Sequence, residues 1–165
     1  MSFYESLGFL VFGSRLRRLS EAFLADVNKI YAAHNLQFDA AWFPVFYILS
    51  RQETVSIKDI ADELGISHSA VSQLISSLQQ KGLTKTTTDG DDARKKVVAF
   101  TPKGKKLQKQ VQPIWNALKS AMEALAGEGA HSKTILTAIA EIEQGLQREP
   151  VFDRVQHELI SNKQS

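Results

Sequence analysis

The segment 68–81 combines an apolar stripe with an opposite face of short, uncharged side chains that form hydrogen bonds. The residues of that polar face are His68, Ser69, Ser72, Gln73 and Ser76. A solvated helix surface more often carries Glu and Lys, and serine lowers helix propensity. Small side chains let a helix lie deep in the major groove of DNA, where Gln can bind adenine through two hydrogen bonds and Ser or His can reach base edges or phosphates. The pattern predicts base recognition, and a tolerated polar surface is the alternative.

A second candidate contact is Arg94, which stands with Asp92 and Lys95 next to an Asp-Gly turn. An arginine on a protruding loop can enter the minor groove of DNA, where the phosphates on both sides deepen the negative potential. Asp92 can accept a hydrogen bond from the guanidinium and fix its direction. The alternative is an exposed ion pair that contributes about 0–1 kcal/mol to stability and has no function.

The distribution of charge favours a polyanionic partner more than the net charge does. The chain carries 20 Lys and Arg against 18 Asp and Glu, for a net charge of +2. Residues 81–109 hold nine of the basic residues and three of the acidic ones. Clustered positive charge in a nearly neutral chain is a candidate surface for nucleic acid. A solvated, lysine-rich surface explains the same cluster equally well.

Several classes of chemistry are excluded by residue types that the chain lacks. It has no Cys, which excludes disulfides, thiolate catalysis and Cys-ligated zinc, and its four His stand far apart without the spacing of a metal site. We find no pairing of nucleophile and base and no glycine-rich phosphate loop, so we expect no enzyme and no cofactor. The apolar run 7–13 is too short to cross a bilayer and lacks a preceding basic region, which predicts a cytoplasmic protein without membrane contact.

The elements that position the polar face form a helix-turn-helix. A short amphipathic helix over 57–64 is followed by Gly65, which suits the left-handed position after a helix. Ser67 then serves as a preferred N-cap for the helix 68–81. Two helices joined by three residues with a glycine at the turn are typical of this motif.

A β-hairpin follows, so the motif is predicted to be winged. Residues 83–88 and 95–101 are rich in Thr and in β-branched residues, and they flank the Asp-Gly turn. The fold class is therefore mainly α with a small β-hairpin wing, a winged helix-turn-helix with long terminal helices.

Helical periodicity covers most of the remaining chain. The expected helices are 3–33, 40–50 with Asp39 as N-cap, 102–125, a long helix capped by Ser132, and 151–160. Pro44 either sets a later start of its helix or kinks it. The apolar stripe of the first helix exceeds what its own neighbours can cover, which indicates packing against a further surface.

These motifs resemble the multiple antibiotic resistance regulator (MarR) family. The resemblance rests on D-D-A-R-K-K-V-V-A-F-T-P-K-G, in which Asp92 and Arg94 match the wing motif of the family and Phe100, Thr101 and Gly104 match the motif that closes the wing. It covers residues 36–125 by motif. Ala93 departs from the pattern, because many relatives carry a second basic residue there.

The resemblance implies a single domain over 1–165, with a DNA-binding region at 36–108 and dimerisation helices at 1–34 and 109–165. A homodimer would bind a pseudo-palindromic operator in double-stranded DNA and act as a ligand-responsive repressor, with Ser67 and the polar face of 68–81 among its contacts. A small aromatic or anionic effector is implied as well. Trp42, Phe46 and Trp115 could line its pocket, although aromatic residues at helical spacing are more often core. The alternative function is a winged-helix protein-interaction module without DNA binding.

Overall fold

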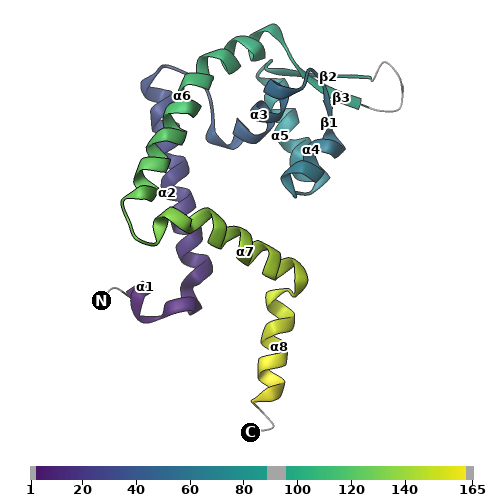
Figure 1. The fold of residues 1–165 in the computed structure, drawn as a ribbon. Coiled ribbons are helices and arrows are strands. Elements are labelled where there is room, and N and C mark those ends of the chain that lie inside the picture. The colour runs from purple at the N-terminus through teal and green to yellow at the C-terminus, as the bar shows by residue number, and fades with distance from the viewer. Residues whose placement is uncertain (1–2, 89–95, 163–165) are drawn as a thin grey trace. The chain divides into compact units, whose positions relative to one another are not determined.

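The computed structural model describes residues 3–88 and 96–162, so the predicted turn with Asp92, Arg94 and Lys95 lies outside the described residues. The chain divides into two compact units, Met1–Trp115 and Asn116–Ser165. In chain order, the helices, 3₁₀ turns (η) and strands are α1 Phe3–Ser6, η1 Gly8–Val11, α2 Phe12–Ala33, η2 Ala40–Trp42, α3 Phe43–Arg51, β1 Val55–Ser56, α4 Ile57–Leu64, α5 His68–Gln80, β2 Thr84–Thr88, β3 Lys96–Phe100, α6 Pro102–Gly127, η3 Ser132–Thr134, α7 Ile135–Arg148 and α8 Val151–Ser161 (Figure 1).

The first unit begins with a helical segment that is interrupted near its start. Gly8, the first residue of η1, has a φ of +52°, in the left-handed region, and marks the interruption between α1 and α2. Asp39 is an N-cap as predicted, but it caps η2, because its Oδ1 accepts a hydrogen bond from the Ala41 N–H at 2.8 Å. Pro44 stands in the first turn of α3, so it sets a later helix start and does not kink the helix.

A small antiparallel sheet with the strand order β1-β3-β2 completes the winged fold. The hairpin pairs Thr84 with Phe100 and Thr88 with Lys96, which confirms the two predicted wing strands. Strand β1 was not anticipated, because two residues are too few to show the alternation of a strand. It adds Val55 opposite Val98 and joins the start of α4 to the sheet.

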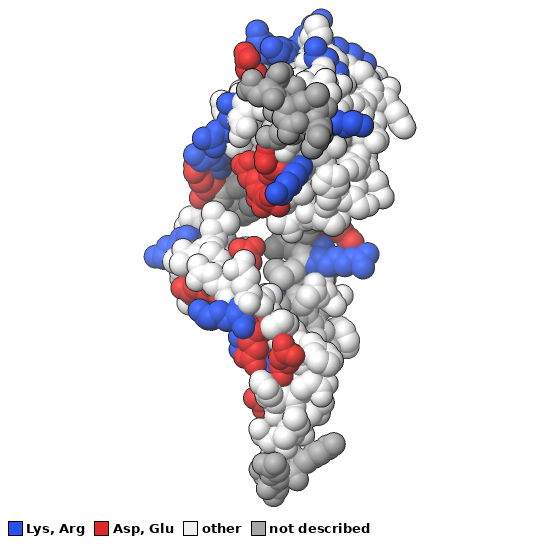
Figure 2. Space-filling view, turned by 90° about the vertical axis from the view of Figure 1, so that its right-hand side faces the viewer, with Lys and Arg blue, Asp and Glu red and all other residues white. Residues whose placement is uncertain are grey.

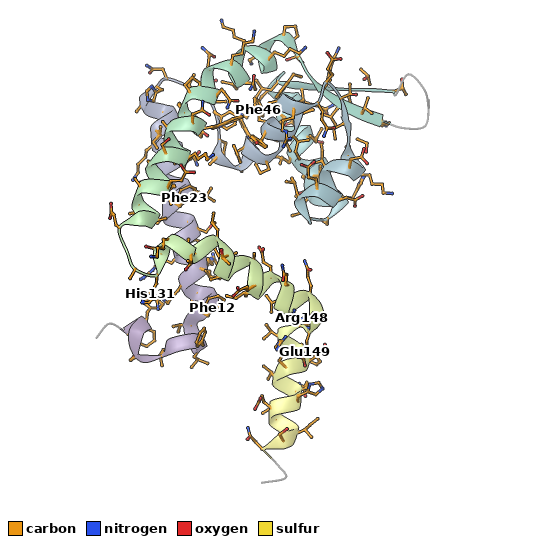
Figure 3. All side chains as sticks on the ribbon, viewed as in Figure 1. Phe12, Phe23, Phe46, His131, Arg148 and Glu149 are labelled. Carbon is orange, nitrogen blue, oxygen red and sulfur yellow. The ribbon has the colours of Figure 1, made fainter. Side chains whose placement is uncertain are left out.

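The core of this unit lies between the helices and the inner face of the sheet. Val45, Phe46, Ile60 and Val98 are fully buried there, and Figure 3 shows Phe46 within densely packed side chains. The ring of Phe46 packs edge-on against Phe100 at 4.8 Å between ring centroids. The helices that carry the candidate site are thus held on a rigid base.

The second unit contains the end of α6 together with η3, α7 and α8. No described residue between 116 and 162 is buried, and α7 and α8 expose apolar side chains along their length. Ser132 does not cap α7 as predicted, because it lies in η3 and its hydroxyl donates a hydrogen bond to the Ala126 carbonyl at 2.8 Å. Within the two described ranges, no helix is long and apolar enough to cross a membrane.

Candidate nucleic-acid interface

The turn between α4 and α5 is fixed by side-chain caps and one left-handed residue. Ser56 accepts a hydrogen bond from the Asp59 N–H at 3.0 Å and starts α4, and Gly65 ends it with a φ of +62°. The Ser67 hydroxyl accepts a hydrogen bond from the Ala70 N–H at 3.2 Å and starts α5. The three residues between the helices therefore have little conformational freedom, and the predicted helix-turn-helix geometry is confirmed.

Helix α5 has one buried and one exposed face. Val71, Ile75 and Leu78 are at most 2% exposed and point into the core. The opposite face carries the residues that the sequence singled out, which we call the reading face: His68, Ser69, Ser72, Gln73 and Ser76. Ser72 is half-buried and its hydroxyl lies 3.5 Å from His68 Nδ1, whereas the other four are exposed. No residue of α5 is Asp, Glu, Lys or Arg, so this face presents neutral donors and acceptors.

Polar contacts connect the end of α5 to the wing. Gln79 donates a hydrogen bond from Nε2 to Thr86 Oγ1 at 2.7 Å, from the last turn of the helix to the middle of β2. The Leu83 N–H bonds the Leu78 carbonyl at 2.9 Å, across a turn in which Gly82 has a φ of +69°. Helix α5 and the wing are therefore coupled in position by a contact that the sequence did not reveal.

Thr101 and Gly104, which close the wing motif, hold the start of α6 against the wing. The Thr101 hydroxyl lies 2.6 Å from the Gly82 carbonyl and 3.2 Å from the Leu83 carbonyl, and it accepts the Gly104 N–H at 3.1 Å. The Thr101 N–H donates to the Leu83 carbonyl at 3.0 Å. A Cβ at Gly104 would lie 2.0 Å from the Leu83 carbonyl oxygen and 2.9 Å from Phe100 Cδ1. Only glycine permits this close approach.

Five of the described lysines of the basic segment 81–109 border two different hollows. Lys105 and Lys109 border a hollow beside the end of α3, whereas Lys103 and Lys106 border a different one with Lys81, at the end of α5. In Figure 2, basic side chains gather along the upper edge of the molecule. The start of α6 lies at the same height in Figure 1. The division follows the helix period, because 103, 106 and 110 share one face of α6 and 105 and 109 share another. That spacing is visible in the sequence and could have shown that Lys103 and Lys106 lie on a different face of α6 from Lys105 and Lys109.

The aromatic residues considered for an effector pocket are part of the core. Trp42, Phe46 and Trp115 are at most 8% exposed. Trp115 donates a hydrogen bond from Nε1 to the hydroxyl of Tyr31 at 3.0 Å. Burial raises the pKa of Tyr31, and the hydrogen bond from Trp115 opposes this rise in part. Trp42 also forms one wall of the hollow beside Lys81. A role of these three residues in ligand binding stays a prediction.

The arrangement of α4, α5 and the three-stranded sheet defines a winged helix-turn-helix protein. The sequence profile of the MarR family matches residues 36–95. An uncharacterised HTH-type transcriptional regulator, YfiV of Bacillus subtilis (strain 168), is 27% identical over 114 residues, which are 68% of this chain and 69% of that protein. Over residues 36–95 the chain is therefore similar to the MarR family of transcriptional regulators.

Solved structures agree with the fold over most of the chain. The S. aureus MepR–DNA complex has a TM-score of 0.65 at 19% identity and covers 83% of this chain and 96% of that one. The PcaV transcriptional regulator from Streptomyces coelicolor, in complex with its natural ligand, has a TM-score of 0.64 at 14% identity and covers 88% of this chain and 98% of that one.

Proposed function

We propose that this protein binds double-stranded DNA sequence-specifically and regulates transcription as a homodimer. The observation that carries the proposal is the reading face, which is mostly exposed, contains no Asp, Glu, Lys or Arg and is held on a helix whose other side is buried. Hydrogen bonds to base edges discriminate sequences, whereas contacts to phosphates attract every duplex. The solved complex of MepR with DNA, which shares the fold, supports this reading.

The proposed contacts divide between bases and the sugar-phosphate backbone. Gln73 and Ser69 are exposed on successive turns of α5, where they reach base edges in the major groove. Ser67, at the start of the helix, and His68 lie where backbone N–H groups and the helix dipole favour phosphate. Arg94 and Lys95 contribute the minor-groove contact of the wing, with Asp92 orienting the arginine. Residues 36–108 form the DNA-binding region in this proposal.

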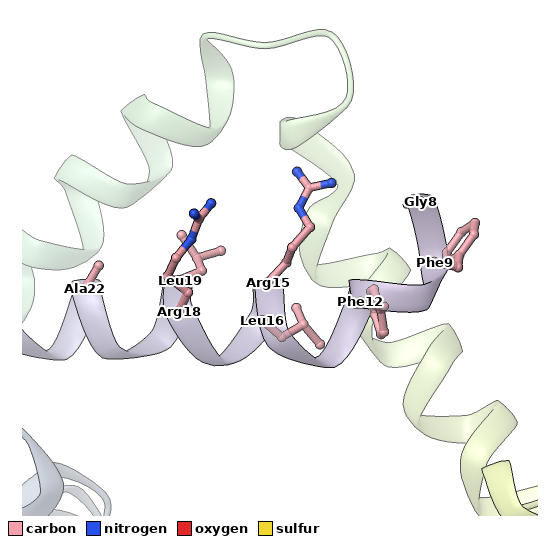
Figure 4. Close-up of a pocket in the computed structure, with 8 residues that line it drawn as sticks. All are labelled: Gly8, Phe9, Phe12, Arg15, Leu16, Arg18, Leu19 and Ala22. Atoms are coloured by element: carbon pink, nitrogen blue, oxygen red, sulfur yellow. The ribbon is translucent and has the colours of Figure 1, made fainter. Parts of the chain in front are cut away.

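The homodimer uses the helices at 1–34 and 109–165. Helix α2 exposes a row of large apolar side chains, among them Leu19 at 68%. Its first turns border a hollow in which Arg15 and Arg18 extend from the helix beside Leu16 and Leu19 (Figure 4). The apolar side chains of α7 and α8 are exposed as well. Exposed apolar rows of this extent are typical of interfaces. Two-fold symmetry would place two copies of α5 in successive major grooves of a pseudo-palindrome, about 34 Å apart.

We also propose that the protein represses transcription and that a small ligand regulates its binding to DNA. The structure of PcaV with its natural ligand shows that one protein of this fold binds such a compound. An effector that binds one arrangement of the dimer better than another would shift the affinity for DNA. Trp42, Phe46 and Trp115 are the residues proposed to contact it.

The test compares a selected operator duplex with a random duplex of equal length. An operator is first obtained by selection from random DNA, and affinities are then measured by fluorescence anisotropy. Replacing Gln73 by alanine should weaken operator binding by about 1–3 kcal/mol and affect the random duplex much less. Ser69→Ala should act in the same direction. Gln80→Ala is the matched control, because Gln80 is exposed on the same helix but borders the hollow beside Lys81.

Equal losses on both duplexes would show that Gln73 and Ser69 do not read bases. Selection that enriches no sequence, together with weak and salt-sensitive binding to every duplex, would overturn the proposal in favour of a protein-interaction module.

A further inference from the structure

A hollow of about 450 Å³ lies at the C-terminal end of α5, where that helix meets the start of the wing and the first turns of α6. We call it the basic hollow. Three lysines border it, Lys81, Lys103 and Lys106, together with the amide side chains of Gln80 and Gln110. Its apolar wall includes Trp42. The volume is within the range of sites for small molecules.

No carboxylate among the described residues compensates the charge of the basic hollow. None of its lining residues is Asp or Glu. The ion pairs found among residues 3–88 and 96–162 do not include Lys81, Lys103 or Lys106. Three ammonium groups around one concave surface concentrate positive potential, because low-dielectric walls focus the field.

Two of the three ammonium groups are held in place. Lys103 donates a hydrogen bond from Nζ to the Lys81 carbonyl at 2.8 Å, which joins the start of α6 to the end of α5. Lys81 Nζ lies 5.4 Å from the centroid of the Trp42 ring. Side chains that are already positioned lose less conformational freedom when a ligand binds.

We propose that the basic hollow binds a small organic phosphate. Lysines bind phosphate as point charges, whereas a planar carboxylate is more often held by the two-pronged guanidinium of arginine, and arginine does not line this hollow. The phosphate group faces the ammonium groups of Lys103 and Lys106. An apolar body lies against Trp42, which the proposed function also assigns to the effector contact, so the inference rests on that part of the proposed function. The amides of Gln80 and Gln110 bond polar substituents.

This site is separate from the proposed contact with DNA. Ser67 caps the start of α5 and Lys81 its end, and a helix of 13 residues is about 20 Å long. The reading face ends at Ser76, and Gln80 and Lys81, which border the hollow, follow it at the end of the helix, so we expect that a duplex and the organic phosphate can be bound at the same time. The inference therefore stands or falls independently of DNA recognition.

The experiment uses the full chain and measures binding of phenyl phosphate by isothermal titration calorimetry at constant ionic strength. Inorganic phosphate and benzoate are the comparison ligands. We expect one phenyl phosphate per chain, bound more tightly than either comparison ligand. The variant Lys103→Gln with Lys106→Gln should bind phenyl phosphate at least about tenfold more weakly, because two charge-assisted contacts are lost.

The matched control is Lys105→Gln with Lys109→Gln, which removes the same charge from the same helix on its other face. This variant should bind phenyl phosphate like the wild type. Lys106→Glu, a single change of an exposed side chain, should weaken binding as well and provides a second variant should the double one not fold. Adding a saturating duplex should leave phenyl phosphate binding unchanged.

Four results would overturn the proposal. They are no binding of phenyl phosphate to the wild type, an equal loss in both double variants, benzoate binding as tightly as phenyl phosphate, and displacement of phenyl phosphate by the duplex. The last result would place the anion on the DNA-binding surface. Loss of DNA recognition in Gln73→Ala, by contrast, would leave phenyl phosphate binding unchanged.

Discussion

Replacing Gly104 with alanine would force apart the start of α6 and the wing. The new Cβ would lie 2.0 Å from the Leu83 carbonyl oxygen, and this oxygen accepts the Thr101 N–H at 3.0 Å. Backbone must therefore move. Overpacking of this kind costs about 1–3 kcal/mol. Each weakened hydrogen bond at Leu83 adds about 1 kcal/mol. The better helix propensity of alanine offsets up to about 1 kcal/mol of this loss in the free energy of unfolding.

With the two hydrogen bonds that the Leu83 carbonyl accepts from Thr101, the balance is a net loss of about 2–4 kcal/mol, which corresponds to a melting temperature lower by about 4–16 °C for a chain of this size. The fluorescence of Trp42 and Trp115, the two tryptophans of the chain, reports unfolding of the first unit in urea or on heating. Gly13→Ala is the control, because Gly13 lies in α2 and a Cβ there meets no atom within 4 Å. The reasoning is refuted if Gly104→Ala is as stable as Gly13→Ala.

Three further changes test other parts of the molecule. Arg94→Ala should weaken binding to every duplex and lower the slope of log affinity against log salt by about 0.9, and Asp92→Ala should have a smaller effect in the same direction. If Arg94→Ala binds the duplex with wild-type affinity at two salt concentrations, the wing does not contact DNA. Tyr31→Phe leaves the indole N–H of Trp115 unpaired and should lower the free energy of unfolding by about 1–3 kcal/mol at pH 7. Burial raises the pKa of Tyr31 above 10.0, so the folded state favours the neutral phenol. This contribution to the free energy of unfolding is complete below pH 10.0 and is lost as the pH rises through the raised pKa. Urea titrations from pH 7 to 11 should show this decline in the wild type and not in Tyr31→Phe. Leu19→Glu should convert a dimer, at twice 18.4 kDa by light scattering, into the monomer, and a monomeric wild type would contradict the proposed assembly.

The helix-turn-helix could be predicted because its determinants are local. Gly65 ends α4 and Ser67 caps α5 through residues within four positions of each, so both helix ends can be predicted from the sequence alone. The face of α5 that points outward follows equally from the spacing of Val71, Ile75 and Leu78.

Other features depend on contacts between distant segments and were not predictable in the same way. Strand β1 becomes a strand only because β3 pairs with it. Gln79 bonds Thr86 across the turn at Gly82, and neither residue signals the other in the sequence. Ser132 had the residue type of an N-cap, but a 3₁₀ turn intervenes and its hydroxyl bonds the end of the preceding helix.

The absence of charged residues from α5 has a consequence for how copies of this gene could diverge. In the proposed complex, attraction to the duplex comes from lysines and arginines on other elements, so it is indifferent to what the reading face carries. Exchange of Gln73 or Ser69 for another neutral residue would redirect the preferred base sequence without slowing the search along DNA or altering solubility. A duplicated copy could therefore acquire a separate set of target sites through very few substitutions, all within one turn of helix from each other.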